Sequence, residues 1–200
     1  GLDSKDVISL EDVEPDVNYA LVISTNAGLW RYVLGDTIRF TSTAPYRIKI
    51  TGRTKSFMNA FGEEVIVENA EMAIAEACSK TGAQIRDYTA CPIFMKSIDK
   101  GGHEWAIEFV QYPDDMERFA RVLDEKLRSI NSDYDAKRYQ NMVLDKPTIT
   151  KLKDGTFTNW LKNQEKLGGQ NKIQRLRNDR DLMEQILSYS TDSKIAVHED

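Results

Sequence analysis

The stretch PDDMERFARVLDEKLRSI, residues 113–130, decides the fold class more firmly than any other part of the sequence. Its apolar residues recur at the spacing of one helix face, and they are Met116, Phe119, Ala120, Leu123, Leu127 and Ile130. This spacing is typical of an amphipathic helix with one buried side. Pro113 stands where proline is well tolerated, in the first turn. The sequence therefore predicts a helix over residues 113–130.

Two strand patterns precede this helix. In residues 103–111, the side chains of Trp105, Ile107 and Phe109 alternate with those of polar or small residues. Strict alternation is typical of a half-buried strand. A second apolar run covers residues 88–95, and a Lys-Gly-Gly turn at 100–102 separates the two runs. These features predict a hairpin of two antiparallel strands.

The segments further out complete the domain. Residues 67–78 carry an apolar stripe at helical spacing that ends near Gly82, and a strand pattern covers residues 142–152. The order helix, strand, strand, helix, strand predicts a small α+β sandwich, with an antiparallel sheet and helices on one face. Residues 182–187 predict a short amphipathic turn, followed by a polar tail.

The first quarter of the chain has a different pattern. Residues 19–24, 29–41 and 46–51 have strand character, and turn residues at 26–28 and 43–45 separate them. They predict a short antiparallel β meander. The strand pattern stops at residues 52–56, where Arg53 and Lys55 add charge, so we expect a domain boundary there. Residues 1–51 would be a mostly β region, and residues 52–200 the small α+β domain.

Composition excludes several classes of function. The chain has 32 acidic and 27 basic residues, a net charge of −5, and so offers no broad positive field for a nucleic acid. No run of about 18 apolar residues predicts a membrane span, and no basic segment followed by an apolar run predicts an export signal. We therefore expect a soluble, cytoplasmic protein that binds neither nucleic acid nor membrane.

The cysteines and histidines predict no metal site. Cys78 and Cys91 lack the Cys-x-x-Cys spacing, and the chain has only two histidines to accompany them. We expect both cysteines to be small core residues in a reducing compartment. His103 and His198 have no nucleophile or metal ligand at a recognisable spacing. The three tryptophans, Trp30 among them, are expected in the core.

A few polar residues have the character of a nucleotide site. Asp36 follows Gly35 in a strand-like setting, and its carboxylate is suited to accept hydrogen bonds from a ribose diol. Arg53 offers a planar fork of donors, and Lys55 a compact charge. Lys172 follows a Gly-Gly pair and is suited to deliver charge to a phosphate or carboxylate. Turn geometry for Asp36, and solvated surface charge for the three cations, remain open alternatives.

Taken together, these segments resemble the C-terminal part of the auxin-responsive-promoter family of acyl-acid amido synthetases, a branch of the acyl-adenylate-forming enzymes. Residues 28–36, Gly-Leu-Trp-Arg-Tyr-Val-Leu-Gly-Asp, are similar to a family segment whose acid binds the ribose of ATP. Residues 52–55, Gly-Arg-Thr-Lys, resemble a hinge about which a small C-terminal domain rotates. The resemblance implies that residues 1–51 are the end of the large N-terminal adenylation domain and residues 52–200 the small C-terminal lid domain. Residues 152–157 and 171–175 resemble two further family segments, the second of which carries a lysine that acts in adenylation.

The resemblance implies roles for individual residues. Tyr32, Asp36 and Arg53 would bind the nucleotide, and Lys172 would be catalytic. Lys55 would be the hinge. Phe61 and Gly62 would lie on the acceptor side, in the segment that approaches the acceptor in the second step. The implied cofactors are ATP and Mg²⁺, and no metal is expected on the protein itself.

The implied reaction joins a carboxylic acid to an amine, usually that of an amino acid, through an acyl-AMP intermediate. Two departures from the family pattern stand out. Gln174 replaces the usual proline, which predicts a less rigid Lys172 loop. The phosphate loop and the acyl-binding body, which lie upstream in that family, are missing, so the chain would be an inactive fragment whose partner is its own N-terminal domain. The alternative is a stand-alone α+β module that binds a small ligand or a protein without catalysis.

Overall fold

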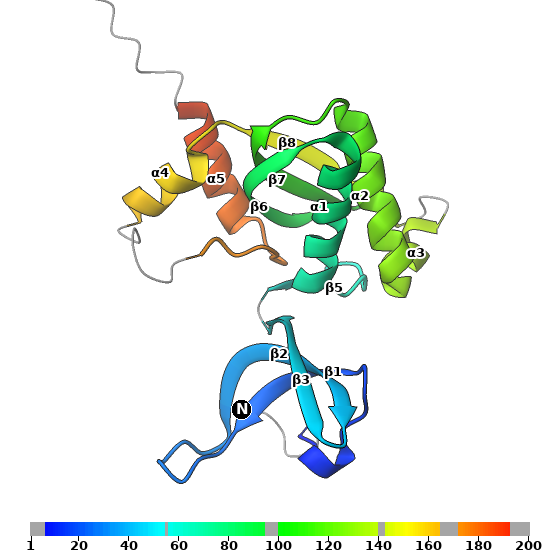
Figure 1. Ribbon diagram of the computed structural model, residues 1–200. Helices are drawn as coiled ribbons and strands as arrows, with labels where there is room; N and C mark the ends of the chain where they lie inside the picture. Colours follow the sequence, from blue (N-terminus) through cyan, green and yellow to red (C-terminus); the bar gives the residue numbers. More distant parts are fainter. Residues whose placement is uncertain (1–6, 55, 95–99, 140–142, 165–171, 193–200) are drawn as a thin grey trace, which may run out of the picture. The chain divides into compact units, whose positions relative to one another are not determined.

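The computed structural model describes residues 7–54, 56–94, 100–139, 143–164 and 172–192, and the chain divides into two compact units, Gly1–Lys55 and Ser56–Asp200 (Figure 1). Gly52 and Arg53 pair with the neighbouring strand of the first unit. The division between Lys55 and Ser56 therefore falls within residues 52–56, a few residues after the domain end expected at residue 51. The roles predicted for the two domains remain predictions.

The first unit is a three-stranded sheet. Its strands are β1 (Asn18–Ile23), β2 (Tyr32–Thr43) and β3 (Tyr46–Arg53), and they pair in chain order with both pairs antiparallel. This confirms the predicted meander. A short 3-10 helix, η2 (Leu10–Asp12), precedes the sheet.

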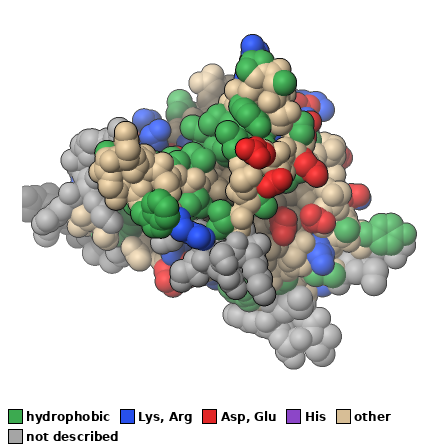
Figure 2. Space-filling model, turned by 90° about the horizontal axis from the view of Figure 1, so that it is seen from below, with side chains coloured by type: hydrophobic (Ala, Val, Ile, Leu, Met, Phe, Trp, Pro, Cys, Tyr) green, Lys and Arg blue, Asp and Glu red, His purple; other side chains and the backbone are tan. Residues whose placement is uncertain are grey.

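The apolar side chains of this sheet are only partly covered. Ile38 and Phe40 on the central strand are buried, and the Phe40 ring meets the rings of Tyr19 and Tyr46 edge-on, with centroids 6.0 Å apart in each case. Their cross-strand neighbours on β3, Ile50 and Ile48, are exposed. Hydrophobic side chains also lie open among charged ones on the face that Figure 2 presents.

One aromatic residue of the first unit departs from the prediction. Trp30 precedes β2 in a loop and is 81% exposed, so its expected place in the core is wrong. The local sequence, with apolar Leu29 beside it, does not distinguish a strand residue from a loop residue. Trp105 is fully buried, as expected.

The second unit is a mixed α+β domain, which confirms the predicted class. Its elements in chain order are β4 (Phe57–Met58), β5 (Val65–Ile66), α1 (Val67–Thr81), β6 (Gln84–Ile93), β7 (Gly102–Gln111), α2 (Met116–Ile130), α3 (Ser132–Arg138), β8 (Thr148–Leu152), α4 (Thr156–Asn163) and α5 (Asp181–Asp192).

Capping residues determine where α1 ends and where α2 begins. Helix α1 ends at Gly82, which takes φ +67°, a conformation that glycine adopts without a Cβ clash. Helix α2 begins at Met116 and not at Pro113, because the Asp115 side chain accepts a hydrogen bond from the backbone N–H of Glu117 and so caps the helix.

The main sheet has the order β6-β7-β8. Strands β6 and β7 form the predicted antiparallel hairpin, with Ala90 opposite Trp105. Strand β8 pairs with β7 in parallel, with Trp105 opposite Ile149. A wholly antiparallel sheet was therefore the wrong expectation for this third strand. Helices α2 and α3 lie between β7 and β8 in the chain, and such a crossover returns the chain in the same direction.

Helices cover both faces of this sheet and not one (Figure 1). On one face, α1 and α2 bury a large cluster around Tyr88, Trp105 and Ile107. On the other face, α4 and α5 pack on Cys91, Ala106 and Leu152. The second layer forms because β6 and β7 carry apolar side chains on both faces of the sheet. This pattern is typical of a sheet that is buried on both faces.

Candidate functional site

Asp36 and Arg53 lie side by side in the first unit. Strand pairing places Asp36 on β2 directly opposite Arg53 on β3, and Arg53 Nε lies 3.5 Å from Asp36 Oδ1. The Arg53 side chain is 78% exposed and that of Asp36 is 30% exposed. Both groups can therefore be reached by a ligand, and the carboxylate is held in place by the cation.

The backbone around Asp36 is fixed by a turn at glycine. Gly35 takes φ +88°, and its carbonyl oxygen accepts hydrogen bonds from the Thr54 N–H at 2.9 Å and from Thr54 Oγ1 at 3.3 Å. These bonds tie the chain just after Arg53 to the residue just before Asp36. The pairing of β1 with β2 also shifts here, which interrupts side-chain alternation between Asp36 and Tyr32. Tyr32 opens β2 and is half-exposed.

The predicted hinge residue, Lys55, lies outside the described residues. Its neighbours Thr54 and Ser56 belong to different units. The hinge role therefore stays a prediction.

Phe61 and Gly62 lie in the connection between β4 and β5, within residues 59–64, which we call the 59–64 loop. The Phe61 ring packs over Gly101, where an added Cβ would lie 2.4 Å from Phe61 Cζ, and its centroid is 6.2 Å from that of Phe94. Gly62 is exposed with φ +82°, and the side chain of Lys137 lies next to it. Phe61 thus anchors the loop, while Gly62 is its accessible point.

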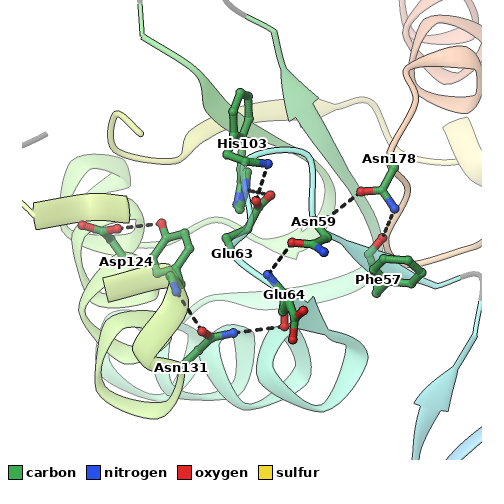
Figure 3. A network of polar contacts seen from close by, with 10 residues as sticks. Phe57, Asn59, Glu63, Glu64, His103, Asp124, Asn131 and Asn178 are labelled. Atoms are coloured by element: carbon green, nitrogen blue, oxygen red, sulfur yellow. Dashed lines mark hydrogen bonds and ion pairs between the residues drawn. The ribbon is translucent and has the colours of Figure 1, made fainter. Parts of the chain in front are cut away.

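A buried carboxylate–imidazole pair lies directly beneath this loop. The side chains of Glu63 and His103 are 0% and 1% exposed, and Glu63 Oε1 lies 2.9 Å from His103 Nε2. The other carboxylate oxygen, Oε2, accepts a hydrogen bond of 2.7 Å from the Phe61 N–H. Burial raises the pKa of Glu63, but the hydrogen bond and the charge of His103 outweigh it, so the pKa lies below its ordinary value. Figure 3 shows the two side chains pointing toward each other.

Asparagine side chains fix the remainder of the loop (Figure 3). Asn178 accepts a hydrogen bond from the Asn59 N–H at 2.7 Å and donates one to the Phe57 carbonyl at 3.1 Å. Asn59 accepts from the Glu64 N–H at 3.2 Å, and Asn131 donates to the Glu64 carbonyl at 3.2 Å. The loop is therefore held from β7, from the α2–α3 junction and from the segment that follows Lys172.

Lys172 is exposed at the start of a firmly anchored segment. Ile173 and Leu176 are buried, and the segment runs beside β6 in parallel. Ala90 donates its N–H to the Arg175 carbonyl at 2.8 Å and accepts from the Arg177 N–H at 3.1 Å. The backbone that follows Lys172 is therefore fixed, and the Lys172 side chain is accessible to a ligand.

Gln174 is held by hydrogen bonds in place of the rigidity that a proline would give. Its side-chain amide donates to the Leu176 carbonyl at 3.1 Å and accepts from Arg177 Nη1 at 3.2 Å, while its own carbonyl accepts from Thr89 Oγ1 at 2.8 Å. The backbone from residue 173 onward is therefore well fixed. Residues 165–171, the rest of the predicted Lys172 loop, lie outside the described residues.

Arg175 adds a further anchor to this segment. Its guanidinium lies 4.5 Å from the centre of the Tyr88 ring and pairs with Asp87 and Glu71. Burial lowers the pKa of the Arg175 guanidinium, an effect that Glu71 opposes. Tyr88 donates its hydroxyl to Glu71 at 3.1 Å.

The structure brings some predicted residues together. Asp36 and Arg53 form one pair in the first unit. In the second unit, Asn178 links the Lys172 segment to the 59–64 loop. Glu63 and His103 were not predicted as site residues, because they are 40 positions apart in the chain and only the fold reveals their contact.

Metal ligands, membrane-spanning helices and cysteine thiols are further features that bear on function. Within the part of the chain that the structure describes, no group of three or more His, Cys, Asp or Glu residues could hold a metal ion. None of the described helices is both long and apolar enough to cross a membrane. Both cysteines are free thiols, and burial raises the pKa of Cys91 to about 12.

Comparisons with known protein families give two matches along the chain. Residues 2–53 match the GH3 family central domain, and residues 68–181 match the GH3 family C-terminal domain. The two matches lie on either side of the division between the structural units.

Individual relatives and solved structures agree with these matches. Indole-3-acetic acid-amido synthetases GH3.3 and GH3.4 of Arabidopsis thaliana are each 28% identical to the chain, over 170 and 174 residues. Each alignment covers 78% of this chain but only 27% and 28% of those proteins. The structure of the GH3.15 acyl acid amido synthetase matches with a TM-score of 0.69 at 20% identity, over 92% of this chain and 36% of that one. The same synthetase in complex with 2,4-DB gives 0.66.

Proposed function

The chain belongs to the GH3 family, and on that premise we propose that it is the C-terminal part of an ATP-dependent ligase that joins a carboxylic acid to an amino acid. The names of its relatives support this proposal, since they are amido synthetases of acyl acids. The chain spans about a quarter to a third of their length. The activity therefore belongs to the full-length protein, and the chain alone is inactive.

The Asp36–Arg53 pair fits a nucleotide. A carboxylate that is fixed but still exposed accepts hydrogen bonds from both hydroxyls of a ribose, and an exposed guanidinium fork suits phosphate oxygens. The two groups are adjacent, with 3.5 Å between Nε and Oδ1, so that one ligand can contact both. This geometry is the observation that carries the proposal. Tyr32 contributes to the same site.

Mg²⁺ would be carried by the phosphates of ATP. The described residues hold no cluster of acidic, cysteine or histidine ligands for a metal ion. Magnesium commonly binds through substrate phosphates and a few carboxylates and keeps several waters.

The proposed reaction has two steps. An oxygen of the substrate carboxylate attacks the α-phosphate of ATP, and pyrophosphate leaves, which gives an acyl-adenylate. The amine nitrogen of the amino acid then attacks the acyl carbon, AMP leaves, and the nitrogen loses a proton. Lys172 stabilises the charge that develops on phosphate and carboxylate oxygens in the first step, while Asp36 and Arg53 hold the nucleotide.

The 59–64 loop serves the second step, with Phe61 and Gly62 on the acceptor side. The conformational change between the steps takes place about Lys55.

The remainder of the protein supplies the acyl pocket and packs against the first unit, whose Ile48 and Ile50 side chains are 52% and 66% exposed. Apolar groups in a row of this kind mark a surface that is covered in the complete molecule.

Isotope exchange in the full-length protein tests this proposal. Labelled pyrophosphate should enter ATP only when a suitable carboxylic acid is present, and addition of an amino acid should release AMP and form an amide. A panel of aromatic and aliphatic acids is the probe. Release of ADP and phosphate, or exchange that ignores the carboxylic acid, would contradict an acyl-adenylate mechanism.

A further inference from the structure

The buried Glu63–His103 pair contacts the backbone of the 59–64 loop from the protein interior and so can fix the conformation of the loop. We propose that Glu63 and His103 are positioning residues for the acyl-transfer step, holding this loop in the conformation that admits the amine to the acyl-adenylate. This inference rests on the proposed ligase function and adds two residues to it. Neither side chain is exposed to solvent, so neither can touch the substrate.

The backbone on both sides of Glu63 is in an unusual conformation. Gly62 has φ +82° and Glu64 has φ +44°, and the second value is unfavourable for a residue with a side chain. A segment of this kind does not keep its shape unless its surroundings impose it. The loop conformation is therefore held by its contacts and would relax if they were removed.

The carboxylate of Glu63 provides the central contact. One oxygen accepts from the N–H of Phe61, two residues earlier, and the other faces His103 Nε2. Because an ionised carboxylate only accepts hydrogen bonds, Nε2 must be the donor. The loop is thus tied to the first residues of β7 by one side chain.

The polar character of the pair is informative because apolar residues fill such positions at least as stably. Replacement of both partners of a buried hydrogen bond by apolar groups of similar shape can be neutral or stabilising, whereas the hydrogen bond between Glu63 and His103 fixes one geometry. His103 Nδ1 has no hydrogen-bond partner among the residues that the structure describes. Among the described residues, the His103 side chain therefore has one hydrogen-bond partner, which is Glu63 of the 59–64 loop.

The experiment uses the full-length protein and three single variants. His103→Leu removes the donor at similar volume. His103→Gln keeps a side-chain N–H that can reach the same carboxylate. Glu104→Gln is the matched control, because Glu104 is the next residue on β7 and pairs with Thr150 and Arg180 instead. For each variant, carboxylate-dependent pyrophosphate exchange reports the first step, and single-turnover transfer from preformed acyl-adenylate reports the second.

We expect His103→Leu to lower the transfer rate about 100-fold, the scale of a displaced reacting group, and to leave pyrophosphate exchange within about twofold of wild type. His103→Gln should transfer the acyl group at least about tenfold faster than His103→Leu. Glu104→Gln should leave both rates unchanged. Hydrogen exchange of the Phe61 amide should become faster in His103→Leu alone.

Two results would overturn the inference while the ligase proposal stands. In one, His103→Leu transfers the acyl group as fast as wild type. In the other, it loses exchange and transfer equally, which is the behaviour of a residue needed only for folding. Absence of exchange in the wild-type protein would instead refute the ligase proposal, and the inference with it.

Discussion

In the proposed function, Asp36 and Arg53 of the first unit contribute to ligand binding more than to stability. The ion pair between Asp36 and Arg53 is accessible to solvent, with side chains that are 30% and 78% exposed, and surface pairs stabilise a fold by about 0 to 1 kcal/mol. Both side chains therefore serve the proposed nucleotide site at little cost to the sheet around them.

Replacement of Asp36 by alanine should weaken ATP binding without unfolding the protein. We expect the KM for ATP in pyrophosphate exchange to rise about tenfold or more, since a hydrogen bond to a charged group contributes about 1.5 to 3 kcal/mol. The melting temperature should change little. Asp12→Ala, which removes another exposed carboxylate of the same unit, is the control. An unchanged KM in Asp36→Ala would remove Asp36 from the site.

Glu63 should make folding stability depend on pH. Its pKa is lower in the folded protein than its ordinary value, so its contribution is complete above about pH 5 and is lost as the pH falls through the folded value. In urea unfolding, Glu63→Gln should cost about 1 to 3 kcal/mol at pH 7, and clearly less at pH 3.5. A cost that does not change with pH would show that the carboxylate is not stabilised by its partners.

The sequence predicts some of these residues and not others. Asp36 and Arg53 stand in short motifs whose chemistry is visible in the chain, and strand pairing brings them together. Glu63 and His103 carry no local signal, because a polar residue in a loop or at the start of a strand is normally solvated. Trp30 shows the opposite error, since an aromatic residue among apolar neighbours does not reveal that its loop is exposed.

At the level of secondary-structure elements, α2 stabilises the second unit through one apolar face. Leu123 is fully buried in the main cluster, while Arg121 is exposed on the same helix. Leu123→Ala should lower the free energy of unfolding by about 2 to 5 kcal/mol, because it leaves a cavity. Arg121→Ala should change it by less than about 0.5 kcal/mol. Urea unfolding of both variants measures the difference, and equal effects would contradict the described packing.

Element type was more predictable than element pairing. The helical period of α2 and the alternation of β3 are local patterns, and both elements form within a few residues of where these patterns predict them. The parallel pairing of β8 with β7 is set by the path of the chain through α2 and α3, which no residue of β8 encodes. Helix α4 was not predicted, because Thr156 and Phe157 have strand propensity and the helix is stabilised by burial against the sheet.

A buried carboxylate also determines where α4 begins. Glu108 on β7 accepts hydrogen bonds from the N–H groups of Gly155 and Phe157, at 2.9 and 3.1 Å. The first turn of the helix is thereby capped from the sheet, and not by its own N-terminal residue. Arg86 neutralises Glu108 at 2.9 Å. Caps supplied from distant residues cannot be recognised from the sequence around the helix.

At the scale of the whole molecule, the chain consists of two units that differ in how fully they bury their apolar side chains. The second unit buries clusters on both faces of its sheet, whereas the first leaves apolar side chains of β3 exposed. The candidate residues are divided between them, with Asp36 and Arg53 in the first and Lys172 in the second. In the proposed ligase, the two units therefore contribute different residues to the reaction.

The most direct test of this account is carboxylate-dependent pyrophosphate exchange by the full-length protein, measured for Lys172→Ala and for Lys151→Ala. Lys151 is an exposed lysine of β8 in the same unit and serves as the matched control. We predict that Lys172→Ala lowers exchange by about 100- to 1,000-fold, the scale of one preorganised charge contact, and that Lys151→Ala exchanges at the wild-type rate. Equal rates in the two variants would contradict the account.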